Sequence, residues 1–124
     1  MNSILIIQDI PSINLLLESM LSGEGFSVSK ALSGEEGLKL CVSNKFDLIL
    51  LDYMMPGLNG IDTCKILRSM ENTKKTPIIL ISALEETELN SMKDKINEAG
   101  FNGIMQMPFK SETVLDTVMS FIHG

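Results

Sequence analysis

The sequence lacks the features that mark membrane, secreted and nucleic-acid-binding proteins. No apolar run approaches the roughly 20 residues that a helix needs to cross a bilayer. The N-terminus has no charged segment followed by a long apolar one, so no secretory signal is predicted. Ten Lys and Arg against sixteen Asp and Glu give a net charge of −6, which argues against nucleic acid or an anionic membrane as a direct partner.

Cysteine is also scarce, since the chain has only Cys41 and Cys64. Both fall on apolar positions of predicted helices, which favours buried, reduced thiols in a cytoplasmic protein over a disulfide or a metal site. The chain has 124 residues, of which 44% are hydrophobic. That size and composition predict one globular domain spanning residues 1–124.

Strand-like and helix-like segments alternate along the chain. Short apolar runs between turn signals predict strands at 4–8, 46–52, 77–82 and 101–107, and alternation of apolar and polar residues predicts a half-buried edge strand at 26–30. Apolar residues at helical spacing predict helices that begin near Ser12, Ser33, Gly60 and Ser111, and one helix from about Leu89 to Gly100. Ser33 and Glu36 are expected to form a capping box, with Cys41 and Val42 on the inward face of that helix.

This order predicts an α/β fold: a doubly wound, five-stranded parallel sheet with helices on both faces. Right-handed crossovers allow few topologies, and the strand order 2-1-3-4-5 has a single reversal. That order places the first and third strands side by side. Ligands bind such sheets at this point, beyond the carboxyl ends of the strands.

An acidic residue follows or ends each of these two strands. Asp9 follows Ile4–Gln8, and Asp52 ends an apolar run just before the turn Tyr53–Gly57. Two carboxylates at one sheet edge can share a hard cation or a transferred group. A turn-capping role is the structural alternative for Asp52, and Asp9 could simply begin a helix.

Four segments together resemble the receiver domain of bacterial two-component response regulators, over the whole chain. They are Ile4–Asp9, Asp47–Gly60, Pro77–Ala83 and the pair Pro108-Phe109. The second segment, DLILLDYMMPGLNG, is highly specific, and the others gain weight from their order and spacing. The resemblance implies a flavodoxin-like receiver fold. It also implies a signalling domain, not an enzyme, that takes a phosphoryl group from a histidine kinase or a histidine phosphotransfer protein.

The resemblance also implies a role for each site residue. Asp52 would be the phosphoacceptor, and Ser82 would hydrogen-bond the phosphoryl group. Mg²⁺ would be held by Asp9, Asp52 and the backbone carbonyl of Met54. The chemistry agrees with these roles, because a carboxylate can accept a phosphoryl group once a cation neutralises the repulsion between the anions. Mg²⁺ prefers oxygen ligands and keeps several waters.

Three positions depart from the family's pattern. Gln8 replaces the first acid of the pair after strand 1, Met107 replaces a lysine, and Ile104 replaces the aromatic residue of the family's switch. Gln8 could still ligate Mg²⁺ through its amide oxygen or a water, so weaker Mg²⁺ binding is expected. A hydrogen bond to a charged group contributes about 1.5–3 kcal/mol, and methionine cannot make it. Weaker coupling of phosphorylation to output is therefore expected.

Two other functions remain open from the sequence. The chain could be a pseudo-receiver, a protein-interaction module that signals without phosphate. An enzyme or flavoprotein on the same fold is disfavoured, because the loop after Asp9 is not rich in Ser, Thr and Gly, and neither Asp9 nor Asp52 has a second acid two residues later.

The resemblance also implies a binding face. An output partner or a second copy would bind the face made by the helix near 89–96, the strand 101–107 and the last helix.

Overall fold

The computed structural model describes residues 2–123 of the chain, which form an α/β fold around one parallel sheet. Its strands run in the order β2-β1-β3-β4-β5, as predicted. The strands are β1 (Ser3–Ile7), β2 (Ser27–Ala31), β3 (Leu48–Asp52), β4 (Ile78–Ser82) and β5 (Gly103–Gln106). The doubly wound fold class is therefore confirmed. The two ends of the predicted 1–124 domain lie outside the described residues.

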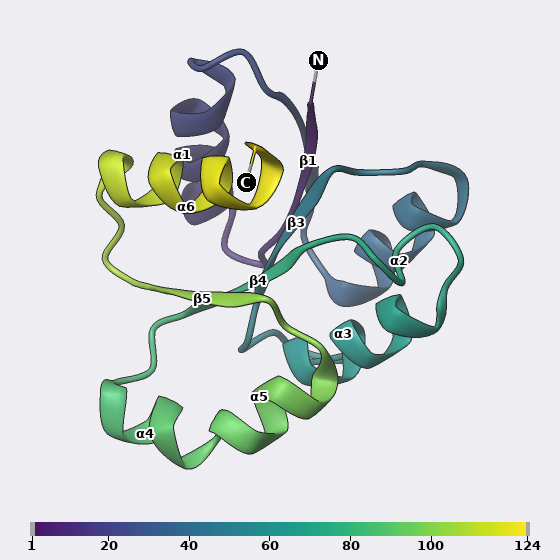
Figure 1. The fold of residues 1–124 in the computed structure, drawn as a ribbon, viewed down its shortest axis with the longest axis vertical. Coiled ribbons are helices and arrows are strands. Elements are labelled where there is room, and N and C mark those ends of the chain that lie inside the picture. Colours follow the sequence, from purple (N-terminus) through teal and green to yellow (C-terminus); the bar gives the residue numbers. More distant parts are fainter. Residues whose placement is uncertain (1, 124) are drawn as a thin grey trace.

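Helices cover both faces of the sheet. They are α1 (Pro11–Ser22), α2 (Gly34–Ser43), α3 (Gly60–Ser69), α4 (Glu86–Ser91), α5 (Lys93–Ala99) and α6 (Ser111–His123). Figure 1 shows α1 and α6 together on one face, with α2 to α5 on the other. Across residues 2–123, none of these helices has the length and apolar character needed to span a membrane.

The apolar core has two layers because side chains on a strand point alternately to opposite faces. Ile4 and Ile6 of β1 pack with α1 and α6, whereas Leu5 and Ile7 pack with α2 and α3. All five residues of β3 are buried. A strand buried on both faces reads as a continuous apolar run, which is why β3 is so evident in the sequence.

The helix predicted from Leu89 to Gly100 is two helices in the structure. The backbone at Met92 (φ −103°, ψ 1°) departs from helical geometry, and this residue ends α4 and caps α5. Leu89 and Ile96 are both buried against Leu80 of β4, as the apolar spacing predicted. The prediction of a single helix here was therefore wrong, but the prediction that Leu89 and Ile96 face the core is confirmed.

The inward face of α2 was assigned partly wrongly. Val42 is 71% exposed, whereas Gly34, Gly37 and Cys41 are buried. A side chain at Gly37 would collide with Ile7, so this helix presents small residues to the sheet and approaches it closely. With Gly37 facing the sheet, Val42 lies on the side of α2 that faces solvent.

The prediction at the start of α2 is confirmed in part, and the prediction for the cysteines is confirmed. Ser33 caps α2, because its hydroxyl accepts the N–H of Glu36 at 3.1 Å, but the return hydrogen bond to the Glu36 side chain that would complete a capping box is not present among the described residues. Cys41 and Cys64 are both buried and free, and burial raises the pKa of each thiol to about 11. Such thiols stay protonated and unreactive at neutral pH.

Candidate functional site

The carboxyl ends of β1 and β3 lie side by side, which brings Asp9 and Asp52 to one place. The two strands are paired in register up to Ile7 and Leu51, so the next residues, Gln8 and Asp52, follow at the same edge of the sheet. Asp52 is only 5% exposed. The proximity of the two acids predicted from the topology is therefore present in the structure.

The pKa of Asp52 is raised to about 6 by this environment. Burial is the largest cause, and the negative charge of Asp9 is the second. The backbone N–H groups of Tyr53 and Met54 and the side chain of Gln8 act in the opposite direction, because they stabilise the ionised carboxylate. The carboxylate thus lies next to donors but has no cationic partner among them.

Gln8 is fully buried at the end of β1. Its Oε1 accepts the backbone N–H of Ile10 at 3.1 Å. Its Nε2 and the Oδ1 atom of Asp9 are both buried and have no hydrogen-bond partner within residues 2–123. Nε2 therefore lies near enough to Asp52 to stabilise its charge, but outside hydrogen-bond geometry.

The loop between β3 and α3 is held at both ends by backbone hydrogen bonds. Tyr53 N–H donates to the Ile81 carbonyl at 3.0 Å, and Gly60 N–H donates to the Tyr53 carbonyl at 3.0 Å. A side chain at Gly60 would collide with the Asp52 carbonyl, so only glycine lets α3 begin this close to the site. Gly57 has a φ of 77°, which also favours glycine.

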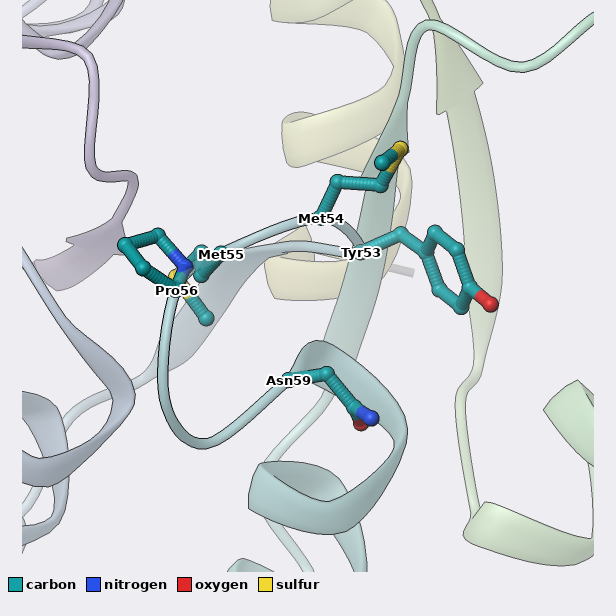
Figure 2. A pocket seen from close by; sticks show the side chains of 5 residues that line it. All are labelled: Tyr53, Met54, Met55, Pro56 and Asn59. Atoms are coloured by element: carbon teal, nitrogen blue, oxygen red, sulfur yellow. The ribbon is translucent and has the colours of Figure 1, made fainter.

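The outer side of this loop is a shallow apolar pocket of about 410 Å³. Figure 2 shows its lining, with the Tyr53 ring and Pro56 extending to opposite sides of the loop and Asn59 at the start of α3. Met54 is 66% exposed here. Asn59 caps α3 by accepting the N–H of Asp62 at 2.9 Å, which fixes where the loop ends.

Ser82 ends β4, beside Asp52 on β3, and is almost fully buried. Its Oγ accepts the N–H of Leu84 at 2.9 Å, so the hydroxyl proton is free to donate elsewhere. Asp52 and Ser82 line a common cavity of about 320 Å³. The structure therefore brings together the phosphoacceptor candidate and the hydroxyl predicted to act with it.

The far wall of this cavity is apolar. Met107, whose N–H donates to the Ser82 carbonyl at 2.8 Å, lines it together with Ile10, Ile13 and Leu84. Asp52 is the one charged residue in the cavity lining that the structure describes. Lys110 is exposed and is not part of that lining, so it does not replace the missing lysine.

Ile104 is remote from the cavity. It lies on β5, is 41% exposed, and lines a separate groove of about 470 Å³ between α4 and α6. This groove lies on the face predicted for an output partner or a second copy.

The donor atoms at this edge fit a hard divalent cation with few protein ligands. Asp9 and Asp52 offer neighbouring carboxylates, and Asp9 Oδ1 is buried without a partner in the described part of the chain. No group of three or more His, Cys, Asp and Glu forms within residues 2–123. Two carboxylates suit Mg²⁺, which keeps several of its waters.

Asn14 is a site-shaping residue that the sequence analysis missed. Its buried Nδ2 donates to the carbonyls of Gln8 (3.2 Å) and Ala31 (3.1 Å), and so ties the ends of β1 and β2 to α1. The available signal was an amide on the inward stripe of a helix, between Ile13 and Leu17. A polar residue at such a position needs buried partners.

Comparison with known proteins places the chain in a family. The family model of the response regulator receiver domain matches residues 4–119. The chain therefore belongs to the response regulator receiver family of two-component signal transduction, as its resemblance implied. Receiver domains are signalling domains rather than classical enzymes, and they interact with histidine kinases and output domains.

Individual relatives agree with this assignment. The chain is 32% identical over 125 residues to response regulator ArlR of Staphylococcus aureus, covering 99% of the chain and 53% of that protein. It thus spans about half the length of the curated relatives it matches. Its fold is similar to the Vibrio cholerae chemotaxis protein CheY4 (TM-score 0.91, 29% identity, 98% of each chain).

A third relative contains a metal ion. The receiver domain of sensor histidine kinase PA1611 from Pseudomonas aeruginosa PAO1 has a TM-score of 0.89 and 26% identity, with 99% of this chain and 98% of that one covered. That structure has a magnesium ion coordinated in its active-site cleft. Magnesium is thus a cofactor of receiver domains in general.

Proposed function

We propose that this domain accepts a phosphoryl group on Asp52, with Mg²⁺ held by Asp9, Asp52 and the backbone carbonyl of Met54. The observation that carries the proposal is the position of Asp52. It is a buried carboxylate at the switch point of the sheet, next to a second acid, and it opens into a cavity with Ser82. Packing alone does not account for two neighbouring acids at this depth.

Asp52 would act as the nucleophile. One carboxylate oxygen attacks the phosphorus of a phosphohistidine, the P–N bond breaks, and its electron pair returns to the imidazole. With a pKa of about 6, the Asp52 carboxyl is mostly ionised at neutral pH, as a nucleophile must be. The N–H groups of Tyr53 and Met54 lie close enough to stabilise the negative charge of the carboxylate, and the free proton of Ser82 donates to a phosphoryl oxygen.

Bound Mg²⁺ supplies neutralisation of the repulsion between Asp52 and the incoming phosphoryl oxygens. Its protein ligands would be two carboxylates and one carbonyl, so we propose weaker binding than at a site with three acids. The donor would be a histidine kinase or a histidine phosphotransfer protein. We also propose that 1–124 is a single receiver domain that works in the cytoplasm.

Transmission of the signal would be weakened in this domain. Met107 places no donor and no charge at the cavity wall nearest β5, and Ile104 provides no aromatic ring on the face between α4 and α6. A phosphoryl group on Asp52 would therefore lack a charged link to β5. An output partner or a second copy would bind the α4–β5–α6 face.

A pseudo-receiver is the second candidate function. The observation that favours it is the cavity lining, in which Asp52 is the single charged residue described and no cation faces it. In that case the domain would bind its partner without phosphate.

Measuring the intact mass of the protein separates the two functions. The protein is incubated with Mg²⁺ and acetyl phosphate, or with a histidine kinase, and compared with Asp52→Asn. We expect one added phosphoryl group in the native chain and none in the variant. A native chain that stays unmodified with every donor would favour the pseudo-receiver.

A further inference from the structure

The side-chain amide of Gln8 is held in one orientation. The side chain is completely buried, and its Oε1 accepts the backbone N–H of Ile10 at 3.1 Å. Its Nε2, the other polar atom of the planar amide, is also buried and has no hydrogen-bond partner within residues 2–123. Gln8 therefore offers donors, not an acceptor, to the edge of the sheet where Asp9 and Asp52 lie.

The reverse orientation is unfavourable because it would turn the NH₂ group toward the N–H of Ile10. Two donors would then face each other, and the Ile10 N–H would lose its acceptor, which is unfavourable for a group partly removed from water. The turn around Ile10 is also fixed. Its carbonyl accepts the N–H groups of Ile13 (3.1 Å) and Asn14 (3.0 Å) at the start of α1.

Backbone contacts of Gln8 hold the side chain in place as well. Its N–H donates to the Ala31 carbonyl at 3.0 Å, and its own carbonyl accepts from Asn14 Nδ2 at 3.2 Å. The residue is thus held from β2 and α1 at once.

An acceptor close to this amide is the Asp52 carboxylate, which follows the last β1–β3 pair, Ile7 and Leu51, and whose charge the Gln8 side chain stabilises. An amide NH₂ carries partial positive charge, so it attracts a carboxylate and repels a divalent cation. Gln8 and a bound cation would therefore compete for the same side of Asp52. A small movement of the carboxylate would bring it into hydrogen-bond geometry with Nε2.

We propose that Gln8 is a hydrogen-bond donor that orients the Asp52 carboxylate and is not a ligand of the divalent cation. It is a positioning residue, which holds one carboxylate oxygen and leaves the other free to react. It also limits the cation to Asp9, Asp52 and the Met54 carbonyl, and so weakens that site. This role differs from the ligand role inferred from the sequence, and it rests on the cation site of the proposed function.

The test is a Mg²⁺ titration of the native chain, Gln8→Met and Gln8→Glu, followed by the fluorescence of Tyr53. Tyr53 is a convenient probe because it adjoins Asp52 and is the only tyrosine in a chain without tryptophan. Methionine has a similar length but removes both the oxygen and the donor. Glutamate keeps the shape and adds an anionic ligand.

We expect Gln8→Met to bind Mg²⁺ at least as tightly as the native chain, and Gln8→Glu to bind it about tenfold more tightly or better, since tenfold is 1.4 kcal/mol. A Gln8→Met variant that binds threefold more weakly would overturn the proposal, because it would show that the amide oxygen is a ligand. Gln106→Met, the same exchange at an exposed position on the same edge, is the control and should leave the affinity unchanged.

A second measurement needs no variant and covers the case in which Gln8→Met does not fold. Hydrogen exchange of the Ile10 backbone amide is compared without and with saturating Mg²⁺. We expect slow exchange in both, because Oε1 stays on the Ile10 N–H. Faster exchange with Mg²⁺ would show that the oxygen has turned to the cation and would overturn the proposal.

Failure of the proposed function gives a different pattern. If the native chain binds no Mg²⁺ but Gln8→Met and Gln8→Glu both do, Gln8 is shown to weaken the cation site and the proposal holds, although the native chain then lacks the Mg²⁺ binding that the proposed function needs. If Gln8→Glu gains no affinity over the native chain, Gln8 does not limit the site and the proposal fails, whatever the phosphorylation assay shows.

Discussion

The two halves of the site, at the ends of β1 and β3 and at the ends of β4 and β5, differ in chemistry. The first half holds Gln8, Asp9 and Asp52, which are polar and mostly buried. The second half holds Ser82 but is otherwise walled by Met107 and Leu84. The half that would receive a phosphoryl group retains charge and donors, whereas the half that would report its arrival offers one hydroxyl.

Under the proposed function, this difference separates the two tasks of a receiver, accepting the phosphoryl group and reporting it. Accepting the group needs a nucleophile and a cation, which two carboxylates beside each other can provide. Reporting it needs a contact that forms only with the phosphoryl group and moves β5. Three variants sharpen or break this comparison, beginning with the one of largest expected effect.

Asp52→Asn should stabilise the metal-free protein at pH 8 by about 3 kcal/mol. The reason is that folding raises the pKa of this carboxyl from 3.8 to about 6, so the folded state binds a proton that the unfolded state releases. The raised pKa therefore has no effect on the free energy of unfolding of the native chain well below pH 3.8, and it lowers that free energy by the full amount once the pH has risen through 6. Urea unfolding in EDTA at pH 4 and pH 8 measures the effect.

The gain from Asp52→Asn should fall to about 0.5 kcal/mol at pH 4, where the carboxyl is protonated in the folded state and roughly half ionised in the unfolded state. Asp116→Asn is the matched control, because Asp116 is exposed on α6 and the change should stay within about 0.5 kcal/mol at either pH. Equal stability of Asp52→Asn and the native chain at pH 8 would mean that burying the ionised Asp52 carboxylate beside Asp9 does not destabilise the fold.

Gly60→Ala should destabilise the fold by about 1–3 kcal/mol, because the new methyl group would collide with the Asp52 carbonyl and the Tyr53 backbone. The same collision would displace the loop that carries Met54, so Mg²⁺ affinity should fall as well. Chemical denaturation and a Mg²⁺ titration follow the two effects. Gly23→Ala, in a right-handed helical conformation with room for a methyl group, is the control and should be nearly neutral.

Met107→Lys should strengthen the apolar half of the site. The new ammonium could donate to a phosphoryl group on Asp52, and a charged hydrogen bond contributes about 1.5–3 kcal/mol, or roughly tenfold or more in affinity. Binding of beryllofluoride, a tetrahedral substitute for the phosphoryl group, gives the measurement. Met119→Lys on the exposed side of α6 is the control and should leave the beryllofluoride affinity unchanged. Equal affinities of the two variants would argue that a side chain at position 107 does not contact a phosphoryl group on Asp52.

The fold was predictable in most of its elements because its main signals are local. Apolar runs marked four strands and apolar–polar alternation marked β2, and Ser33 marked the start of α2 by its own hydrogen bond to Glu36. Errors arose where packing between elements decides the outcome. Val42 faces solvent because Gly37 lies against Ile7 of β1 and sets how α2 sits on the sheet, and Met92 interrupts a helix whose apolar spacing is continuous.

The site was predictable in its residue types but not in its hydrogen bonds. Asp9, Asp52 and Ser82 follow from strand ends and from the resemblance. The orientation of the Gln8 amide could not be read from the sequence, because it depends on where the N–H of Ile10 points. Asn14 was missed for the same reason, since its partners Gln8 and Ala31 lie on two other elements.

By itself the sequence determined the alternation of strands and helices, the strand order and the two acids at the switch point. These follow from periodicity, turn residues and the handedness of crossovers, which act over short stretches of chain. Only the tertiary structure decided which atoms of the site face one another. Burial and hydrogen bonding between distant segments set the raised pKa of Asp52, the direction of Gln8 and the apolar wall at Met107.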